Sequence, residues 1–244
     1  MSYFKGKPFY LANYKMKTLI IIPAYNESGN IERVVTNLKD NYPQFDYVII
    51  NDGSKDNTAE ICRRCGFNLI DLPVNLGLAG AFQTGMKYAL LKNYDAAIQF
   101  DGDGQHRPEY IEKMQDEMIA TGADIVIGSR FVSEKKPFSP RMAGSRLISL
   151  LIMLTTGRRI KDPTSGMRLY GRKVLKEFAD KPNYGPEPDT IAYLLNRGCT
   201  VKEVQVTMDE RIAGTSYLSF MSSMHYMLRI CLSILFVQWF RKRG

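Results

Sequence analysis

The amino-acid sequence predicts an α/β domain, in which helices flank a mostly parallel β-sheet. Short apolar runs suited to buried strands alternate along the chain with longer segments whose apolar residues recur at helical spacing. This βα alternation is typical of a mostly parallel sheet with helices on both faces. At 244 residues the chain is long enough to bury one good hydrophobic core.

Six runs are predicted as strands, and four helical patterns lie among them. The strands are Thr18–Ile22, Tyr47–Ile50, Asn68–Leu72, Ala96–Phe100, Asp124–Ile127 and Lys202–Val206. The helical patterns are Ile31–Leu38, Thr58–Cys65, Leu78–Leu91 and a segment that begins at Pro108. In the first pattern the apolar residues fall at positions i, i+3, i+4 and i+7, which form one face of a helix. Asp56 or Ser54 is expected to cap the second helix.

Acidic or polar residues follow three of the predicted strands. Glu27 lies after the first strand, Asp52 after the second, and Asp101 with Asp103 after the fourth. The carboxyl ends of parallel strands meet at one edge of a sheet, which is where open α/β sheets bind ligands. Two carboxylates one residue apart supply the hard oxygen ligands that suit Mg²⁺ or Mn²⁺ held against phosphate oxygens. An isolated pair of this kind is equally compatible with a solvated acidic loop.

The chain carries an excess of basic side chains, with a formal net charge of +8. A basic balance fits nucleic acid, an anionic membrane or phosphorylated substrates as partners. Because no motif that reads DNA or RNA is present, we expect phosphate and membrane partners and no nucleic acid. Cys62 and Cys65 form a C-x-x-C pair, but no second pair stands at zinc-site spacing. We therefore interpret the cysteines as reduced thiols of a cytosolic protein.

Two apolar segments are predicted as amphipathic helices at a membrane surface, near residues 145–157 and 217–240. In the second segment every fourth residue is polar, at His225, Arg229 and Ser233, and the segment ends in aromatic and basic residues. An interfacial helix with an aromatic and basic anchor has this composition. The alternative is a helix in the core or at an oligomer contact.

Three motifs stand in an order and spacing that resemble a known family. They are Pro23-Ala24-Tyr25-Asn26-Glu27, Asn51-Asp52-Gly53-Ser54 and Asp101-Gly102-Asp103-Gly104-Gln105-His106. This set resembles the family 2 glycosyltransferases with a GT-A (Rossmann-like) fold. The later Asp162-Pro163-Thr164-Ser165-Gly166 narrows the resemblance to the dolichol-phosphate mannose synthase branch, whose members are polyprenyl-phosphate glycosyltransferases.

The resemblance implies a metal-dependent enzyme that transfers a sugar, with inversion, from a UDP- or GDP-linked donor to a polyprenyl phosphate. It places the enzyme on the cytoplasmic side of the cell membrane, as a peripheral protein that feeds the synthesis of cell-surface glycans. The expected organisation is an N-terminal extension at 1–15, a GT-A catalytic domain at 16–216 and an amphipathic membrane-associated helix at 217–244. An exposed apolar C-terminal helix is also consistent with a homo-oligomer or a small membrane partner.

The resemblance also assigns roles to individual residues. Asp103 and Gln105 are the implied metal ligands, and Asp101 contacts the nucleotide or shares the Mg²⁺ or Mn²⁺ ion. The implied catalytic residues are Asp101, Asp103, Arg130 and Arg211, of which the two arginines match arginines that grip phosphates. The implied donor-binding residues are Pro23, Ala24, Tyr25, Glu27, Asp52, Asn75, Gly80 and Asp101. Gly102 and Gly104 stand where relatives often carry Ala and Leu, which should loosen this loop without removing its ligands.

Three points stay open in the sequence. Asp52 suits a turn or a helix cap as well as a donor-binding role, because Asp-Gly-Ser is a common turn. A sugar hydroxyl of a growing cell-wall or surface polysaccharide is the alternative acceptor. It would require a general base, for which Glu187 and Asp189 are the candidates. A catalytically silent protein that only binds nucleotide sugar is the third interpretation, and the completeness of the motif set argues against it.

Overall fold

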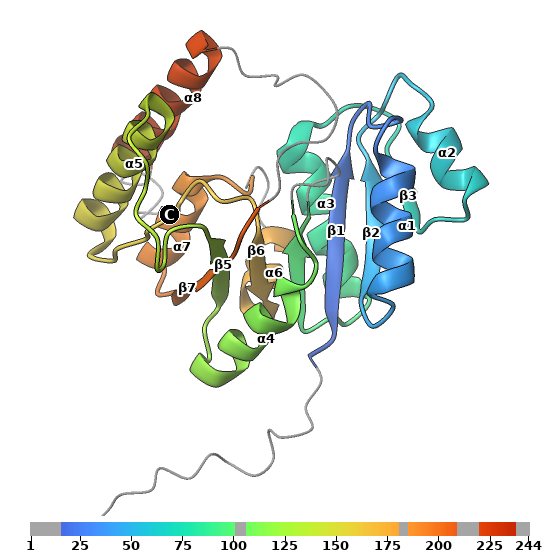
Figure 1. Cartoon of the computed structure of the whole chain (residues 1–244), viewed down its shortest axis with the longest axis horizontal. Coiled ribbons are helices and arrows are strands. Elements are labelled where there is room, and N and C mark those ends of the chain that lie inside the picture. The colour runs from blue at the N-terminus through green and yellow to red at the C-terminus, as the bar shows by residue number, and fades with distance from the viewer. Residues whose placement is uncertain (1–15, 101–105, 181–184, 209–219, 238–244) are drawn as a thin grey trace, which may run out of the picture.

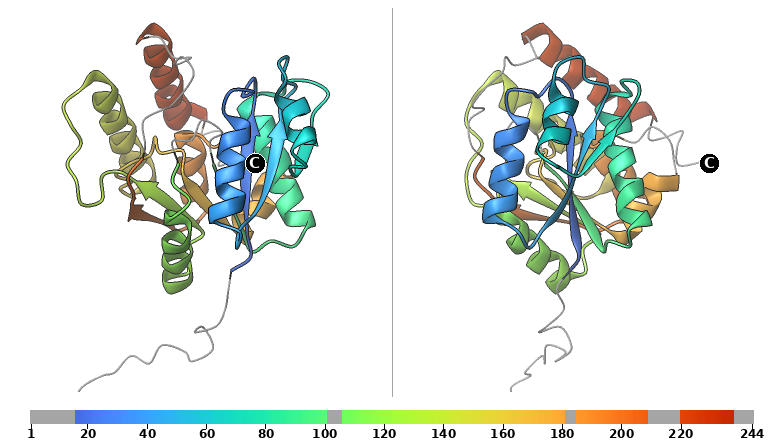
Figure 2. Two further views of the ribbon diagram at one scale, coloured as in Figure 1. Left: turned by 45° about the vertical axis from the view of Figure 1, so that its right-hand side comes forward. Right: turned by 90° about the vertical axis from the view of Figure 1, so that its right-hand side faces the viewer.

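The computed structural model describes residues 16–100, 106–180, 185–208 and 220–237. Within them, helices cover both faces of a seven-stranded sheet. Two further helices, α5 (Pro140–Thr156) and α8 (Phe220–Leu232), lie side by side away from the strands (Figures 1 and 2). The predicted α/β class and the mostly parallel sheet are confirmed.

The strands of the described sheet run in the order β3-β2-β1-β4-β6-β5-β7. They are β1 (Thr18–Ala24), β2 (Asp46–Asn51), β3 (Leu69–Asp71), β4 (Ala96–Gln99), β5 (Ile125–Ser129), β6 (Arg168–Gly171) and β7 (Val201–Gln205). The pairings are parallel except those of β6, which runs antiparallel to both β4 and β5. The carboxyl ends of β1, β2, β4 and β5 therefore meet at one edge, as predicted.

The short strand β6 was not predicted from the sequence. It is four residues long and begins with the charged Arg168, so it lacks the apolar run that identifies a buried strand. Its next residue nevertheless lies in the core, because Leu169 pairs with Ile98 of β4 and Val126 of β5. The six predicted strands are all present, with ends that differ by at most two residues from the prediction.

The helices form two layers on the sheet. One face is covered by α1 (Ile31–Asn41), α2 (Thr58–Arg64) and α4 (Tyr110–Thr121), and the other by α3 (Gly77–Leu91), α6 (Arg172–Asp180) and α7 (Pro188–Asn196). Strand residues alternate between these layers, so that Ile20 packs in one core and Ile21 in the other. In α1 the apolar residues at helical spacing are all buried, which is why the sequence pattern identified this helix.

Helix α5 begins before the predicted segment at 145–157, because local residues start it earlier. The hydroxyl of Ser139 accepts a hydrogen bond from the backbone N–H of Met142 at 3.3 Å, and Pro140 occupies the first turn. The helix ends at Gly157, whose φ of +69° is the left-handed conformation favoured by a glycine after a helix.

Helix α8 packs against α5 and continues through a π-helical segment at Ser233–Val237. A side chain at Gly144 of α5 would collide with Met227 of α8, so this glycine allows the two helices to approach closely. The predicted boundary between residues 216 and 217 lies outside the described residues. None of the helices in the described ranges is both long enough and apolar enough to cross a bilayer.

Arg168, the first residue of β6, is a buried cation that joins two segments of the chain. It is 2% exposed, and its guanidinium donates hydrogen bonds to the backbone carbonyls of Pro163 (2.7 Å), Ser165 (2.8 Å) and Pro186 (2.8 Å). A weaker bond at 3.3 Å reaches the carbonyl of Glu187. Because a buried charge is costly unless it is fully hydrogen-bonded, the 163–165 turn and the start of α7 must stay in this arrangement.

The contact between α3 and β1 provides a test of how the helices pack on the sheet. A Cβ on Gly85 would collide with the fully buried Ile21, two of whose side-chain atoms would lie at 3.0 Å. Gly85→Ala should therefore lower the free energy of unfolding by about 1–2 kcal/mol, because overpacking outweighs the gain of about 1 kcal/mol in helix propensity. Urea denaturation measures the change. Gly29→Ala is the matched control, since no atom lies within 4 Å of its new Cβ; an alanine at residue 85 that stabilised the protein would contradict the packing described.

Candidate functional site

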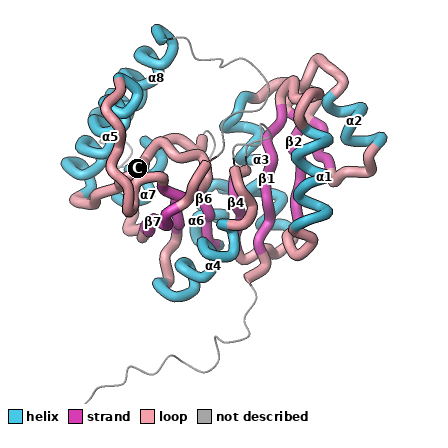
Figure 3. Tube along the Cα trace, viewed as in Figure 1, coloured by secondary structure: helices cyan, strands magenta, loops and turns pink. Residues whose placement is uncertain are grey.

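The loops that follow β1 and β2 are tied together at the carboxyl edge of the sheet (Figure 3). The hydroxyl of Ser54 accepts a hydrogen bond from the backbone N–H of Asn26 at 2.9 Å, and the side-chain oxygen of Asn26 accepts one from Lys55 N–H at 2.8 Å. Asn26 has a φ of +55°, a left-handed conformation that asparagine tolerates. Thr58 and Asp56, at the start of α2, accept hydrogen bonds from the backbone of the first loop. The two motifs therefore form one rigid unit.

The base-binding residues predicted in the first loop lie at this edge. Tyr25 is 38% exposed, so its ring is open for stacking, whereas Pro23 is half-buried and Ala24 buried. Glu27 is half-buried, and one of its carboxylate oxygens accepts a hydrogen bond from the side-chain amide of Asn30 at 2.9 Å. Their contact with a nucleotide stays a prediction.

Asp52 holds the segment that leads into α3. Its side chain is 3% exposed, and one carboxylate oxygen accepts a hydrogen bond from the backbone N–H of Leu76 at 2.7 Å. Gly53, with a φ of +64°, packs so closely on this segment that a Cβ would lie 2.7 Å from Asn75 N. Asn75 in turn accepts from the N–H of Gly77 at 3.0 Å. The structure thus brings Asp52 next to the segment that carries Asn75, through a contact between residues far apart in the sequence, and the donor-binding role of Asp52 stays a prediction. Gly80 follows in the first turn of α3.

The candidate metal ligands follow β4. Asp101, Asp103 and Gln105 lie outside the described residues, as does Arg211, so their predicted roles stay predictions. The residues that flank the first three are both buried: the rings of Phe100 and His106 meet edge to face with centroids 5.4 Å apart. This contact holds the two ends of the acidic loop close to each other at the same edge as Asp52.

Arg130, at the end of β5, forms a two-pronged ion pair with Asp162. The guanidinium donates from Nε at 2.8 Å and from Nη2 at 2.9 Å, and the backbone N–H of Arg130 donates to the same carboxylate at 3.1 Å. Asp162 is fully buried, which by itself would raise its pKa, but these hydrogen bonds and the Arg130 and Lys136 charges hold the pKa below its usual range. Arg130 is thus positioned by Asp162, and its Nη2 also reaches the hydroxyl of Thr164 at 3.5 Å. Within the described residues the N–H donors of Nη1 have no hydrogen-bond partner.

The turn that carries Asp162 is braced on several sides. Glu203 of β7 accepts hydrogen bonds from the backbone N–H groups of Lys161 (2.7 Å) and Asp162 (2.8 Å). The hydroxyl of Ser165 donates to the carbonyl of Gly128 in β5. Arg168, to which the sequence assigned no role, holds the same turn from the other side. Its only signal in the sequence is its place two residues after the Asp-Pro-Thr-Ser-Gly motif.

The acidic pair at the start of α7 is engaged by α8. The hydroxyl of Tyr226 donates to Glu187, and Arg229 lies 3.8 Å from the same carboxylate. The hydroxyl of Ser233 donates to Asp189 at 2.6 Å. Burial and the Glu187 charge raise the pKa of the Tyr226 phenol, so it stays a neutral donor. Two of the polar positions identified in the sequence, Arg229 and Ser233, therefore contact the start of α7, although the Arg229 side chain stays 63% exposed to solvent.

The outer faces of α5 and α8 are apolar and exposed. On α5 these residues are Leu147, Leu150, Met153 and Leu154, and on α8 and its π-helical extension they are Leu228, Leu232, Leu235 and Phe236. The inner faces pack in the core through residues such as Ile148 and Ile234. The two adjacent helices thus each present exposed apolar side chains, and we call these eight residues together the α5–α8 ridge. Exposed apolar patches of this kind mark surfaces for a membrane or a protein partner.

Comparisons with known proteins agree with this arrangement. The family model "Glycosyl transferase family 2" matches residues 19–179. A polyprenol monophosphomannose synthase from Mycolicibacterium smegmatis is 30% identical over 217 residues, which is 83% of this chain and 81% of that protein. A UDP-N-acetylglucosamine–dolichyl-phosphate N-acetylglucosaminyltransferase from Methanococcus voltae is 32% identical over 183 residues, 66% of this chain and 72% of that protein.

A solved structure shares the fold at low sequence identity. The mannosyltransferase from Pyrobaculum calidifontis, in complex with GDP-Man and Mn²⁺, superimposes with a TM-score of 0.63 and 15% identity, covering 91% of this chain and 64% of that one. The matched family region contains the tied loops after β1 and β2, the flanks of the acidic loop and Arg130. The chain therefore belongs to glycosyl transferase family 2 and is a glycosyltransferase with a GT-A fold.

Proposed function

We propose that this glycosyltransferase moves a sugar from a UDP- or GDP-linked donor to a polyprenyl phosphate, with a bound Mg²⁺ or Mn²⁺. The observation that carries the proposal is the position of Arg130. It stands at the end of β5, on the same sheet edge as the tied donor loops, in a chain that also presents the exposed α5–α8 ridge. From the end of β5, the Arg130 side chain could contact both a water-soluble donor and the charged headgroup of a lipid acceptor.

The donor side of the proposal rests on the loops after β1, β2 and β4. Asp101, Asp103 and Gln105 would hold the metal ion, because all three offer the oxygen donors that Mg²⁺ and Mn²⁺ prefer. When bound, such an ion stabilises the negative charge that develops on the departing diphosphate. Tyr25 would stack on the nucleotide base, and the rigid segment around Asp52 and Asn75 would shape the pocket for the donor. The complex of the Pyrobaculum relative with GDP-Man and Mn²⁺ supports this role.

The acceptor side requires no general base. A phosphomonoester has a second pKa of about 6, so a polyprenyl phosphate is largely ionised near neutral pH and can attack the anomeric carbon directly, with inversion. Arg130 would orient this phosphate with the N–H donors that Asp162 does not occupy. The relatives that act on polyprenyl or dolichyl phosphate support this acceptor.

A sugar hydroxyl as acceptor is less well supported. It would need a carboxylate free to take its proton. The two candidates, Glu187 and Asp189, both accept hydrogen bonds from side chains of α8 and its extension. Their engagement suits a role in holding α8 in place.

The α5–α8 ridge would seat the protein on the cytoplasmic face of the cell membrane, as a peripheral enzyme that feeds cell-surface glycan synthesis. Tyr226 of α8 and Ser233 of its π-helical extension are bound to the acidic pair at the start of α7. The exposed side of α8 carries Leu228 and Leu232 together with Arg229, and this mixture suits the headgroup region. In this position the enzyme would meet its acceptor within the bilayer surface.

The reaction is tested by transfer of label from a panel of UDP- and GDP-sugars into organic-extractable lipid. The purified protein is supplied with a polyprenyl phosphate and either Mg²⁺ or Mn²⁺. We expect labelled lipid from one donor, which would identify the nucleotide and the sugar together. Donor binding without a lipid product would instead favour the hydroxyl acceptor.

The metal assignment is tested in the same assay by Asp103→Asn. Loss of a metal ligand removes several kcal/mol of transition-state stabilisation, so turnover should fall by at least about a hundredfold. Asp116→Asn, an exposed position on α4, is the matched control and should retain normal turnover. Full activity of the Asp103 variant would exclude this residue as a metal ligand.

Asp162→Asn tests the positioning of Arg130. We expect the KM for polyprenyl phosphate to rise about tenfold or more, because the guanidinium loses its charged partner, while the KM for the donor changes little. Since the folded-state pKa of Asp162 is depressed, its ionised form stabilises the fold above the unfolded-state pKa, and this stability is lost as the pH falls through the folded-state value. The variant should thus be less stable than wild type near neutral pH, and the gap should narrow in acid.

The control for this variant is Asp40→Asn, an exposed carboxylate on α1. Steady-state kinetics and chemical denaturation at several pH values measure both effects. An unchanged KM for polyprenyl phosphate would show that Arg130, as positioned by Asp162, does not bind the acceptor phosphate.

Removal of apolar side chains tests the membrane contact. Leu154→Ser combined with Phe236→Ser should weaken binding to phosphatidylcholine vesicles by about tenfold or more, because each buried side chain contributes about 1.5–3 kcal/mol. Flotation with vesicles measures the change. Leu91→Ser, at an exposed leucine at the end of α3, is the matched control. Equal binding by the double variant and wild type would show that the ridge does not contact the membrane.

A further inference from the structure

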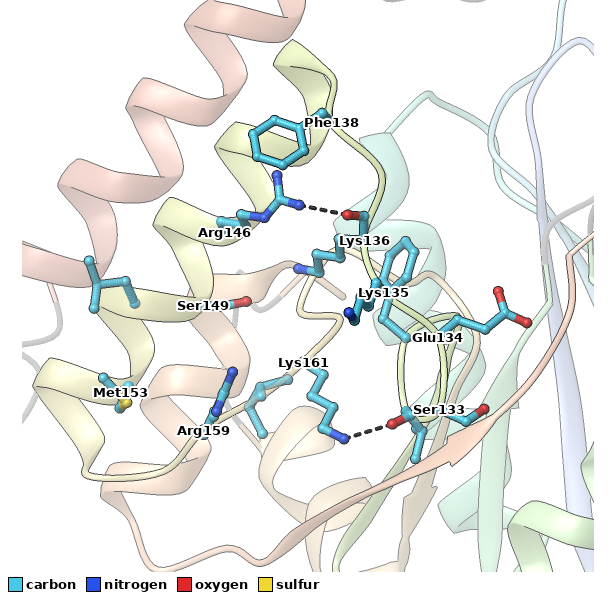
Figure 4. A pocket seen from close by; sticks show the side chains of 14 residues that line it. Ser133, Glu134, Lys135, Lys136, Phe138, Arg146, Ser149, Met153, Arg159 and Lys161 are labelled. Atoms are coloured by element: carbon cyan, nitrogen blue, oxygen red, sulfur yellow. Dashed lines mark hydrogen bonds between the residues drawn. The ribbon is translucent and has the colours of Figure 1, made fainter.

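A cavity of about 750 Å³ lies on the flank of α5 that faces away from α8 (Figure 4). Its walls are the loop 131–138 that follows β5, one side of α5, and the segment 159–161 that follows α5. Neither the predicted donor residues nor Arg130 lines it. The proposed transfer reaction therefore assigns no role to this cavity.

Five cationic side chains line the cavity and dominate its charge. They are Lys135, Lys136, Arg146, Arg159 and Lys161, and Glu134 is the acidic side chain among the lining residues. Figure 4 shows these cations reaching into the space from different walls of the cavity. In the part of the chain that the structure describes, none of the five forms a salt bridge with a carboxylate. Their charge is thus left for a bound anion.

Three of the cations are held in place by neutral groups. Arg146 donates to the backbone carbonyl of Lys136 at 2.6 Å, and Lys161 donates to the carbonyl of Val132 at 2.8 Å. The ammonium of Lys136 donates to the hydroxyl of Ser145 at 2.9 Å. Burial, together with the Arg130 and Arg146 charges, lowers the pKa of Lys136 even though Asp162 and Glu203 oppose this. A cationic cavity fixed in this way is preorganised for an anion with several oxygens.

The rim of the cavity is apolar and continuous with the α5–α8 ridge. Leu150 and Met153 line the cavity and are also among the exposed residues of α5. Leu147 and Leu154 lie on the adjoining exposed side of the same helix. A ligand that fits both parts has an anionic head and an apolar tail, and a bilayer presents such molecules beside the ridge. Basic pockets next to membrane-seated helices bind anionic lipid headgroups in this way.

We propose that this cavity binds the headgroup of an anionic glycerophospholipid of the bilayer, which is neither the donor nor the acceptor of the transfer reaction. The phosphate accepts hydrogen bonds from the cations, and the acyl chains leave over Leu150 and Met153 toward the ridge. Five cations are more than one acceptor phosphate of at most two charges requires. The lipid would fix the depth and orientation of α5 at the bilayer surface.

The test compares vesicles of phosphatidylcholine alone with vesicles that also contain phosphatidylglycerol, using the whole 244-residue chain without donor or acceptor. Lys135→Gln combined with Arg159→Gln removes two exposed cations that make no described hydrogen bond. Each cation near an anionic surface contributes a factor of about five, so affinity for the phosphatidylglycerol vesicles should fall about 30-fold. Binding to pure phosphatidylcholine vesicles should not change.

The matched control is Lys87→Gln combined with Lys176→Gln, which removes the same charge from exposed positions on α3 and α6. Its affinity for the same vesicles should fall by less than about threefold, because these positions lie away from the cavity. Equal losses in the two double variants would show diffuse attraction by net charge and overturn the proposal. Displacement of the wild-type protein by inorganic phosphate at constant ionic strength would also overturn it, since the cavity would then bind soluble phosphate compounds.

Transfer assays in detergent micelles without anionic phospholipid separate this lipid from the acceptor. The Lys135 and Arg159 double variant should keep the wild-type turnover and the wild-type KM for polyprenyl phosphate. A raised KM would assign the cavity to the acceptor and contradict the proposal. Because the vesicle measurement contains no donor, its result stands whether or not the proposed transfer reaction is observed.

Discussion

The hydrogen bonds of the buried Arg168 guanidinium are the interactions on which the positions of Arg130 and α8 depend. Within the described residues this guanidinium pairs with no carboxylate, and the backbone carbonyls of Pro163, Ser165 and Pro186 satisfy it instead. Moving any of these segments would leave a buried charge short of acceptors, at a cost of several kcal/mol. A single cation therefore joins the turn after residue 162 to the start of α7, two segments that the sequence separates by about twenty residues.

Each of these two segments carries a carboxylate that holds a residue from another part of the chain. The turn holds Asp162, which fixes Arg130 at the end of β5, and the start of α7 holds Glu187, which receives Tyr226 of α8. The position of Arg130 and the position of α8 thus depend on the same buried arrangement. Such preorganisation suits a transferase, because groups that stabilise charge are most effective when they need not move during the reaction.

The outer helices leave large apolar side chains exposed although some of their polar side chains are engaged. Tyr226 of α8 and Ser233 of its π-helical extension donate to Glu187 and Asp189, whereas Leu228 and Phe236 are exposed. In water this arrangement leaves apolar area unburied, which is unfavourable. At a bilayer surface the same arrangement is favourable, and the basic cavity beside α5 would add attraction for anionic headgroups. The exposed apolar side chains of α5 and α8 are therefore consistent with a protein that contacts a lipid bilayer.

The sequence by itself determined the βα alternation, the main helices and the strands that end in functional motifs. These follow from local patterns, such as the buried face of α1. Only the tertiary structure decided that Arg168 begins a strand between β4 and β5, that Arg130 pairs with Asp162, and that Tyr226 and Ser233 donate to Glu187 and Asp189. Each of these contacts joins residues that are far apart in the chain. The sequence around a side chain does not specify which distant residue will lie next to it after the chain has folded. The roles of Asp101, Asp103, Gln105 and Arg211, outside the described residues, are inferred from sequence resemblance alone.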